Sequence, residues 1–104
     1  MAAKKALSLL GSTGSIGENV LAVVRQFPQH FRIVGLSAGR RVARLAEQVL
    51  EFLPERVAVG DPALVDELAA LLPPKLRGRI VSGLEGNCTV AALPVADMMV
   101  SAVV

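Results

Sequence analysis

The stretch LSLLGSTGSIGENVL, residues 7–21, joins a short apolar run to a helical pattern through three glycines, Gly11, Gly14 and Gly17. This order is typical of the first strand, turn and helix of a parallel α/β sheet. The N-terminus of such a helix offers unpaired N–H groups and roughly half a positive charge, so an anion can bind there. We expect Gly11 to form the tight turn, Gly14 to allow a ligand to approach the backbone, and Gly17 to let the helix pack closely.

The polar residues of this turn allow two interpretations. Thr13 and Ser15 place short hydroxyl donors at the rim of an anion site. Ser15 followed by Glu18 also predicts a capping box, which requires no ligand. The spacing is GxxGxxG, looser than the GxGxxG of many dinucleotide-binding proteins. A Walker-type triphosphate loop is excluded because no Lys followed by Ser or Thr comes after the glycines.

Apolar runs and helical patterns alternate along the rest of the chain. Strands are predicted over residues 6–10, 31–36, 56–59, 79–82 and 97–104, and helices over 16–27, 42–53, 62–72 and, more weakly, 87–93. Strands connected by crossover helices pair in parallel, and the crossovers are right-handed. We therefore predict an α/β fold, a Rossmann-like doubly wound parallel sheet that is truncated after the fifth strand. Residues 1–104 would form one incomplete dinucleotide-binding domain, without the catalytic and C-terminal domains.

Several side chains have expected places in this fold. In the second helix, the apolar residues are expected to face the core, with Arg44, Glu47, Gln48 and Glu51 on the other side. Asp61 and Asn87 are expected to cap the third and fourth helices. The single histidine, His30, is expected in a surface turn. The single cysteine, Cys88, is expected to be a small buried apolar group.

Composition excludes several classes of function. The chain has 104 residues, a net charge of +2 and no Trp or Tyr, so it offers few side chains on which the bases of a nucleic acid could stack. Charged residues, Pro or Gly interrupt the apolar runs well before the about 20 residues of a membrane span. The apolar run at 6–10 is too short for a secretory signal. With one cysteine and no signal, we expect a cytoplasmic protein without disulfides, nucleic-acid partners or membrane association.

The end of the second predicted strand indicates which dinucleotide the turn would bind. Proteins that bind NAD place an acidic residue about 20 residues after the glycines, on the ribose 2′-hydroxyl. Here no acid occurs between residues 37 and 46; Gly39, Arg40 and Arg41 stand there instead. Guanidinium groups can bind a 2′-phosphate that a carboxylate would repel. This favours NADPH, although Arg40 and Arg41 could simply cover a solvated helix start.

Residues 9–42, LLGSTGSIGENVLAVVRQFPQHFRIVGLSAGRRV, closely resemble the N-terminal NADPH-binding region of the 1-deoxy-D-xylulose 5-phosphate reductoisomerases. The stretches LAEQVLEFLPERVAV and VSAVV resemble its continuation, and residues 75–93 match in outline. The resemblance implies an enzyme of the non-mevalonate isoprenoid pathway. Such an enzyme rearranges a sugar phosphate, 1-deoxy-D-xylulose 5-phosphate, and reduces it with NADPH to 2-C-methyl-D-erythritol 4-phosphate. It uses a divalent cation, Mg or Mn, and forms a homodimer.

The resemblance also implies site residues. Cofactor contacts transfer to two groups, the turn residues Thr13, Gly14, Ser15 and Ile16 and the loop residues Gly39, Arg40 and Arg41. Many members have Asn where this chain has Arg41, and Ala102 and Val103 are expected near the cofactor. The family's metal ligands, substrate-phosphate site and lid lie beyond residue 104. The resemblance therefore implies no catalytic or metal-binding residue in this chain, and this part alone would be inactive.

Two other functions fit the same pattern of residues. A non-catalytic nucleotide-sensing module could use the same fold and turn, because fold does not determine function. Another NADP-linked oxidoreductase, such as a semialdehyde dehydrogenase, is also compatible with the turn. Enzymes of that kind need a nucleophilic cysteine beyond the nucleotide domain, and Cys88 is poorly placed for that role.

Overall fold

A computed structural model describes residues 4–102. The strands are β1 (Lys5–Leu10), β2 (Phe31–Ala38), β3 (Arg56–Val59), β4 (Ile80–Ser82) and β5 (Met98–Ser101). The helices are α1 (Ser15–Gln26), α2 (Val42–Phe52), the 3-10 turn η1 (Pro62–Leu64), α3 (Val65–Ala70), α4 (Pro74–Arg77) and α5 (Gly83–Ala91). The five strands form one parallel sheet in the order β4-β3-β2-β1-β5. The predicted fold class is confirmed.

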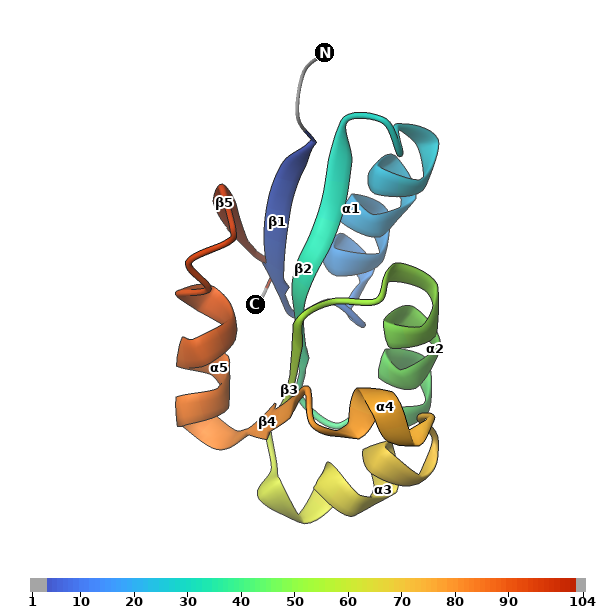
Figure 1. The fold of residues 1–104 in the computed structure, drawn as a ribbon, viewed down its shortest axis with the longest axis vertical. Helices are drawn as coiled ribbons and strands as arrows, with labels where there is room; N and C mark the ends of the chain where they lie inside the picture. Colours follow the sequence, from blue (N-terminus) through green and yellow to red (C-terminus); the bar gives the residue numbers. More distant parts are fainter. Residues whose placement is uncertain (1–3, 103–104) are drawn as a thin grey trace.

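The helices cover both faces of the sheet, as Figure 1 shows. Helices α1 and α2 pack on one face, and α5 packs against strands β1 to β4 from the other. The chain moves outward from β1 through β2 and β3 to β4, and then returns to place β5 on the far side of β1. The direction of winding therefore reverses at β1. In open parallel sheets, ligands bind at the carboxyl ends of the strands beside such a reversal.

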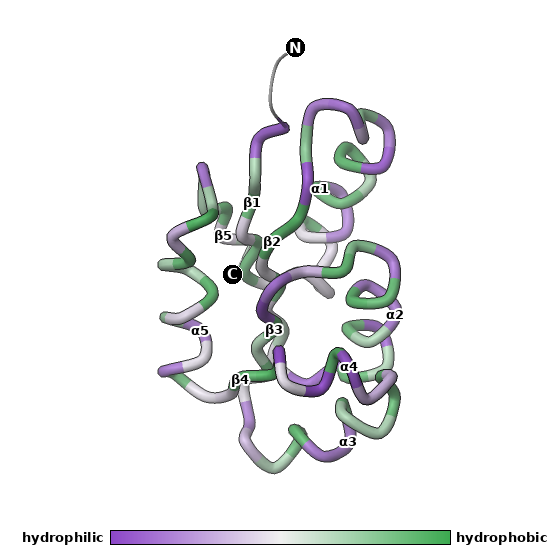
Figure 2. Tube along the Cα trace, viewed as in Figure 1, coloured by the Kyte–Doolittle hydropathy of each residue, from purple (hydrophilic) through white to green (hydrophobic). Residues whose placement is uncertain are grey.

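The core lies mainly between the sheet and helices α1 and α2. Leu9, Leu36 and Val57 of the strands are fully buried, as are Leu21 of α1 and Val49 of α2. Figure 2 shows hydrophobic residues along the central strands and an alternation of hydrophobic and hydrophilic residues along α2. Burying each of these side chains contributes about 1.5–3 kcal/mol. This packing fixes α2 against the sheet, and α2 carries much of the candidate site.

The second half of the chain departs from the predicted helices. The single helix predicted over 62–72 is divided into η1 and α3, and α4 was not predicted. The Asp61 cap is confirmed, because its carboxylate Oδ1 accepts a hydrogen bond from the Ala63 N–H at 2.9 Å. The last predicted strand is described only to Ser101. Residues 103 and 104, which include the expected cofactor neighbour Val103, lie outside the described residues.

Two expectations about α5 were wrong. The helix begins at Gly83, with Ser82 as its N-cap, so Asn87 lies in its middle and does not cap it. Gly86 packs so closely on β4 that an added Cβ would lie 2.9 Å from the Val81 carbonyl carbon. Cys88 is exposed because it lies two residues, roughly half a turn, beyond the buried Gly86. His30 is exposed next to β2, as expected.

Among the described helices, none combines the length and apolar character that crossing a membrane requires.

Candidate functional site

The glycine turn has the tight geometry predicted for it. Gly11 adopts a left-handed conformation with φ of 77°, which glycine adopts without steric cost. The N–H groups of Gly11 and Ser12 both donate to the Ser37 carbonyl of β2, at 2.9 and 2.8 Å. A Cβ at Gly17 would lie 2.2 Å from the Gly11 carbonyl oxygen and 2.8 Å from the Ser12 Cα. Gly17 therefore lets the first turn of α1 press against the preceding loop.

The predicted capping box does not form. Gly14 is the N-cap of α1, and no side chain makes a capping hydrogen bond there. Ser15 lies already inside the helix. Glu18 turns instead to α2, where it accepts two hydrogen bonds from Arg44, at 2.5 and 2.8 Å. The ion pair with Arg44 takes the place of the predicted cap. The N–H groups at the start of α1 therefore donate to no capping side chain.

Several N–H groups of this turn have no acceptor in the part of the chain that the structure describes. Gly14 donates weakly to the Gly11 carbonyl at 3.3 Å, whereas Thr13, Ser15 and Ile16 form no backbone N–H hydrogen bond within residues 4–102. These amides lie at the N-terminus of α1, just beyond the carboxyl end of β1. Unpaired N–H groups at a helix N-terminus form an anion site suited to a phosphate.

A second loop ends the neighbouring strand β2. A Cβ at Gly39 would meet no atom within 4 Å, and one at the exposed Gly14 would meet only the Gly11 carbonyl oxygen, at 3.7 Å. Neither residue has the positive φ that favours glycine. The fold therefore requires glycine at neither position. Both leave open space above the ends of adjacent strands, as expected where a ligand must touch the backbone.

Arg41 connects the two loops. Its Nη1 donates a hydrogen bond of 2.7 Å to the Thr13 carbonyl oxygen, across 28 residues of sequence. Arg40 is exposed, and its guanidinium forms no hydrogen bond or ion pair with the described part of the chain. Arg41 thus makes a tertiary contact in addition to standing at the start of α2. The structure leaves Arg40 available to an anion.

The loop after β2 borders two surface hollows. One of about 320 Å³ is lined by Gly39, Arg40, Gly60, Asp61 and Pro62. The other, of about 470 Å³, lies over the start of α2 between Arg40 and Glu47. The first lies at the loops that follow β2 and β3, and the second extends from the loop after β2 toward Glu67 of α3. The predicted loop residues thus line a concave surface.

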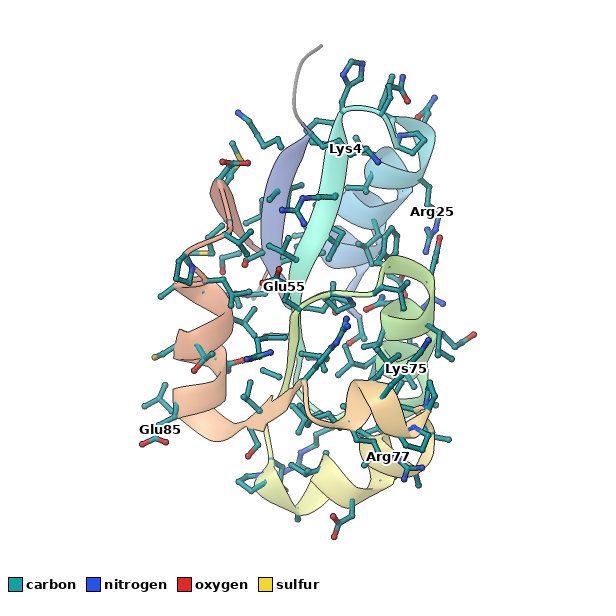
Figure 3. All side chains as sticks on the ribbon, viewed as in Figure 1. Lys4, Arg25, Glu55, Lys75, Arg77 and Glu85 are labelled. Atoms are coloured by element: carbon teal, nitrogen blue, oxygen red, sulfur yellow. The ribbon has the colours of Figure 1, made fainter. Side chains whose placement is uncertain are left out.

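A further hollow, of about 500 Å³, lies at the opposite end of the sheet and contains no predicted site residue. Figure 3 labels two of its lining residues, Lys4 just before β1 and Arg25 in the last turn of α1. Arg25 donates to both carboxylate oxygens of Glu51, at 2.6 and 2.8 Å, and lies over the Phe52 ring. Its charge is therefore already compensated within the protein.

Reasoning from the sequence missed one residue near the turn. Gln48 was expected on the outer side of α2, yet its side chain is fully buried. Its Nε2 donates a 2.8 Å hydrogen bond to the Ser12 carbonyl. The sequence gave no signal of this burial. Gln48 directly follows Glu47 and comes two residues before Leu50, and both of these residues are exposed. No group of three or more His, Cys, Asp or Glu within residues 4–102 could hold a metal ion.

Comparisons with known proteins agree on one family. The family model of 1-deoxy-D-xylulose 5-phosphate reductoisomerase matches residues 7–104. The enzyme of that name from Chlorobium phaeovibrioides is 53% identical over 100 residues, 96% of this chain and 26% of that protein. The one from Thermosynechococcus vestitus is 46% identical over 101 residues, 96% of this chain and 24% of that protein. This chain thus spans about a quarter of the length of these curated relatives.

Solved structures give the same result. A DOX-P reductoisomerase in complex with NADPH, fosmidomycin and magnesium has a TM-score of 0.84 and 33% identity, covering 95% of this chain and 24% of that one. The Zymomonas mobilis enzyme in complex with NADPH has a TM-score of 0.85 and 25% identity, covering 97% and 26%. Sequence, fold and the glycine turn all lead to the same assignment: the chain belongs to the 1-deoxy-D-xylulose 5-phosphate reductoisomerase family.

Proposed function

We propose that residues 1–104 are the NADPH-binding part of a reductoisomerase that converts 1-deoxy-D-xylulose 5-phosphate to 2-C-methyl-D-erythritol 4-phosphate. One observation carries the proposal. The Arg41–Thr13 hydrogen bond holds an amide-rich turn and an acid-free, arginine-bearing loop together at the carboxyl ends of β1 and β2. Bound NADPH would supply the hydride that reduces the rearranged substrate.

The turn would bind the diphosphate of the cofactor. The unpaired N–H groups of Thr13, Ser15 and Ile16 supply donors at a helix N-terminus, where negative charge is stabilised. At Gly14 the backbone is exposed, and a Cβ would occupy the space from which the ligand approaches. The Thr13 and Ser15 hydroxyls would add donors at the rim.

The loop after β2 would bind the adenosine and its 2′-phosphate. Gly39 leaves the wall of the hollow open, and the unpaired Arg40 guanidinium can bind a phosphate with two parallel N–H donors. One N–H of Arg41 is engaged by Thr13, and its other donors remain for the same phosphate. We assign the main selectivity for NADPH over NADH to Arg40, and a shared role to Arg41.

The remaining parts of the proposal rest on family membership. The catalytic residues, the ligands of the divalent cation (Mg or Mn) and the sugar-phosphate site would lie in the rest of the protein. We further propose that the enzyme is a cytoplasmic homodimer of isoprenoid biosynthesis, with no nucleic-acid or membrane partner. This part alone would not turn over substrate.

A titration of the complete gene product with NADPH and with NADH tests the cofactor assignment. We expect clearly tighter binding of NADPH, and in Arg40→Ala a loss of about ten-fold to a hundred-fold in that preference, the range for a hydrogen bond to a charged group. Arg32→Ala is the matched control, because Arg32 is exposed at the amino end of β2, by the other hollow. Equal affinity of the unmodified protein for both dinucleotides would refute the assignment.

A further inference from the structure

The side chain of Gln48 is an unexpected polar group in the core. It is fully buried, at 0% exposure, on the face of α2 that meets the glycine turn. Within residues 4–102, its Oε1 has no hydrogen-bond partner, and neither has the buried hydroxyl of Ser12. Burying an unpaired polar atom is unfavourable, and an apolar side chain of the same size would avoid that cost. Apolar packing of the core therefore does not explain a glutamine here, and the reason for it lies in the hydrogen bond from its Nε2.

The hydrogen bond from Gln48 to Ser12 acts on the geometry of the turn. Because Ser12 offers a carbonyl, the amide must present its nitrogen, and Nε2 donates at 2.8 Å. The Ser12 carbonyl and the Thr13 N–H belong to the same planar trans peptide unit, so they point in opposite directions. Holding the carbonyl toward α2 therefore turns the Thr13 N–H away from α2. That N–H has no backbone acceptor in the described chain.

Two neighbours on the same helix face support this arrangement. Arg41 holds the next carbonyl, that of Thr13, and Arg44 holds Glu18 in the first turn of α1. Arg41, Arg44 and Gln48 are spaced by three and four residues, so they line one side of α2. Gln48 is the only buried member of the three. Solvent therefore cannot replace its hydrogen bond if the amide is removed.

We propose that Gln48 is a positioning residue for the cofactor: by fixing the Ser12–Thr13 peptide unit, it aims the Thr13 N–H at the diphosphate. The inference rests on the proposed function and adds a residue that does not itself touch the ligand. Because the diphosphate is common to NADPH and NADH, losing Gln48 should weaken both to the same extent. This separates its role from that of Arg40, which would change the ratio between them.

The test replaces Gln48 by apolar residues of similar size, Gln48→Met and Gln48→Leu, in the complete gene product. We expect dissociation constants for NADPH and NADH to rise together by about ten-fold, the effect of one charge-assisted hydrogen bond. The urea midpoint should change little, because removing the unpaired Oε1 offsets the loss of the hydrogen bond to the Ser12 carbonyl. Val90→Ala is the control: it truncates a fully buried side chain of α5, on the opposite face of the sheet from α2, so the midpoint should fall while both affinities stay unchanged.

The outcomes separate the two proposals. If the unmodified protein binds neither dinucleotide, the proposed function fails. If it binds them and the Gln48 variants bind equally well, or change the ratio of the two affinities, the positioning role is wrong. If both Gln48 variants fail to fold while Val90→Ala folds, Gln48 is a structural residue and the inference is overturned.

Discussion

Gly17→Ala and Gly14→Ala make a matched pair, because the same methyl group is added at two ends of one helix turn. At Gly17, the new Cβ would lie 2.2 Å from the Gly11 carbonyl oxygen and 2.8 Å from the Ser12 Cα. Ordinary contacts begin at 3.4 Å, so the turn or the helix must move by about 1 Å. Both obstacles are backbone atoms, and the adjoining N–H groups are fixed to Ser37.

This displacement sets the expected cost of Gly17→Ala. Overpacking a filled site costs about 1–3 kcal/mol, and we expect the upper end because no flexible side chain can give way. At Gly14 the backbone has φ −80° and ψ 172°, which alanine adopts freely. A Cβ there would only reach ordinary contact with Gly11, at 3.7 Å. The free energy of unfolding should therefore change by less than about 0.5 kcal/mol.

Urea unfolding and an NADPH titration on the same samples provide the assay. Gly17→Ala should lower stability strongly, and binding should fall with it because the turn is displaced. Gly14→Ala should keep its stability and still lose about ten-fold or more in NADPH affinity, since the methyl group enters the ligand's path. The reasoning is refuted if the two variants are equally stable, or if Gly14→Ala binds NADPH like the unmodified protein.

Two further predictions concern stability alone. The Arg44 hydrogen bonds lower the pKa of Glu18 from its ordinary 4.5. The ionised Glu18 therefore stabilises the folded state above pH 4.5, and this stabilisation is lost as the pH falls through the lowered pKa. Glu18→Gln should accordingly weaken the acid dependence of the urea midpoint, and more so than Glu51→Gln, whose ion pair with Arg25 is more exposed. Leu53→Gly should raise the free energy of unfolding by about 1 kcal/mol in urea titrations, because Leu53 is exposed and holds a left-handed φ of 50°; an unchanged or lower value would contradict this strain.

The features that the sequence predicted well are those set by neighbours in the chain. Hydrophobic periodicity located all five strands and both long helices, because strand and helix faces repeat with fixed spacing. The turn residues Gly11 and Gly17 were assigned correctly, since tight turning and close helix packing are local demands on a residue without Cβ. The parallel pairing of the strands was also predicted, because crossover helices return the chain in the same direction.

The features that the sequence did not predict depend on partners far along the chain. Ser15 and Glu18 have the spacing of a capping box, but Arg44, 26 residues away, binds Glu18 more strongly than a backbone N–H can. Gln48 follows Glu47 in the sequence and was placed with the charged residues of α2, whereas tertiary packing buries it against Ser12. The helix from Gly83 was missed at its start because two glycines lower its propensity while permitting close packing on β4.

The placement of these distant partners explains how a single helix can serve both halves of the candidate site. Helix α2 begins at the loop that would bind the 2′-phosphate. Arg41 at its N-cap and Gln48 within it donate hydrogen bonds to two carbonyls of the turn that would bind the diphosphate. The core side chains Leu45 and Val49 fix α2 on the sheet. The spacing between the two phosphate sites is therefore set by a rigid helix before any ligand arrives, which lowers the ordering cost of binding.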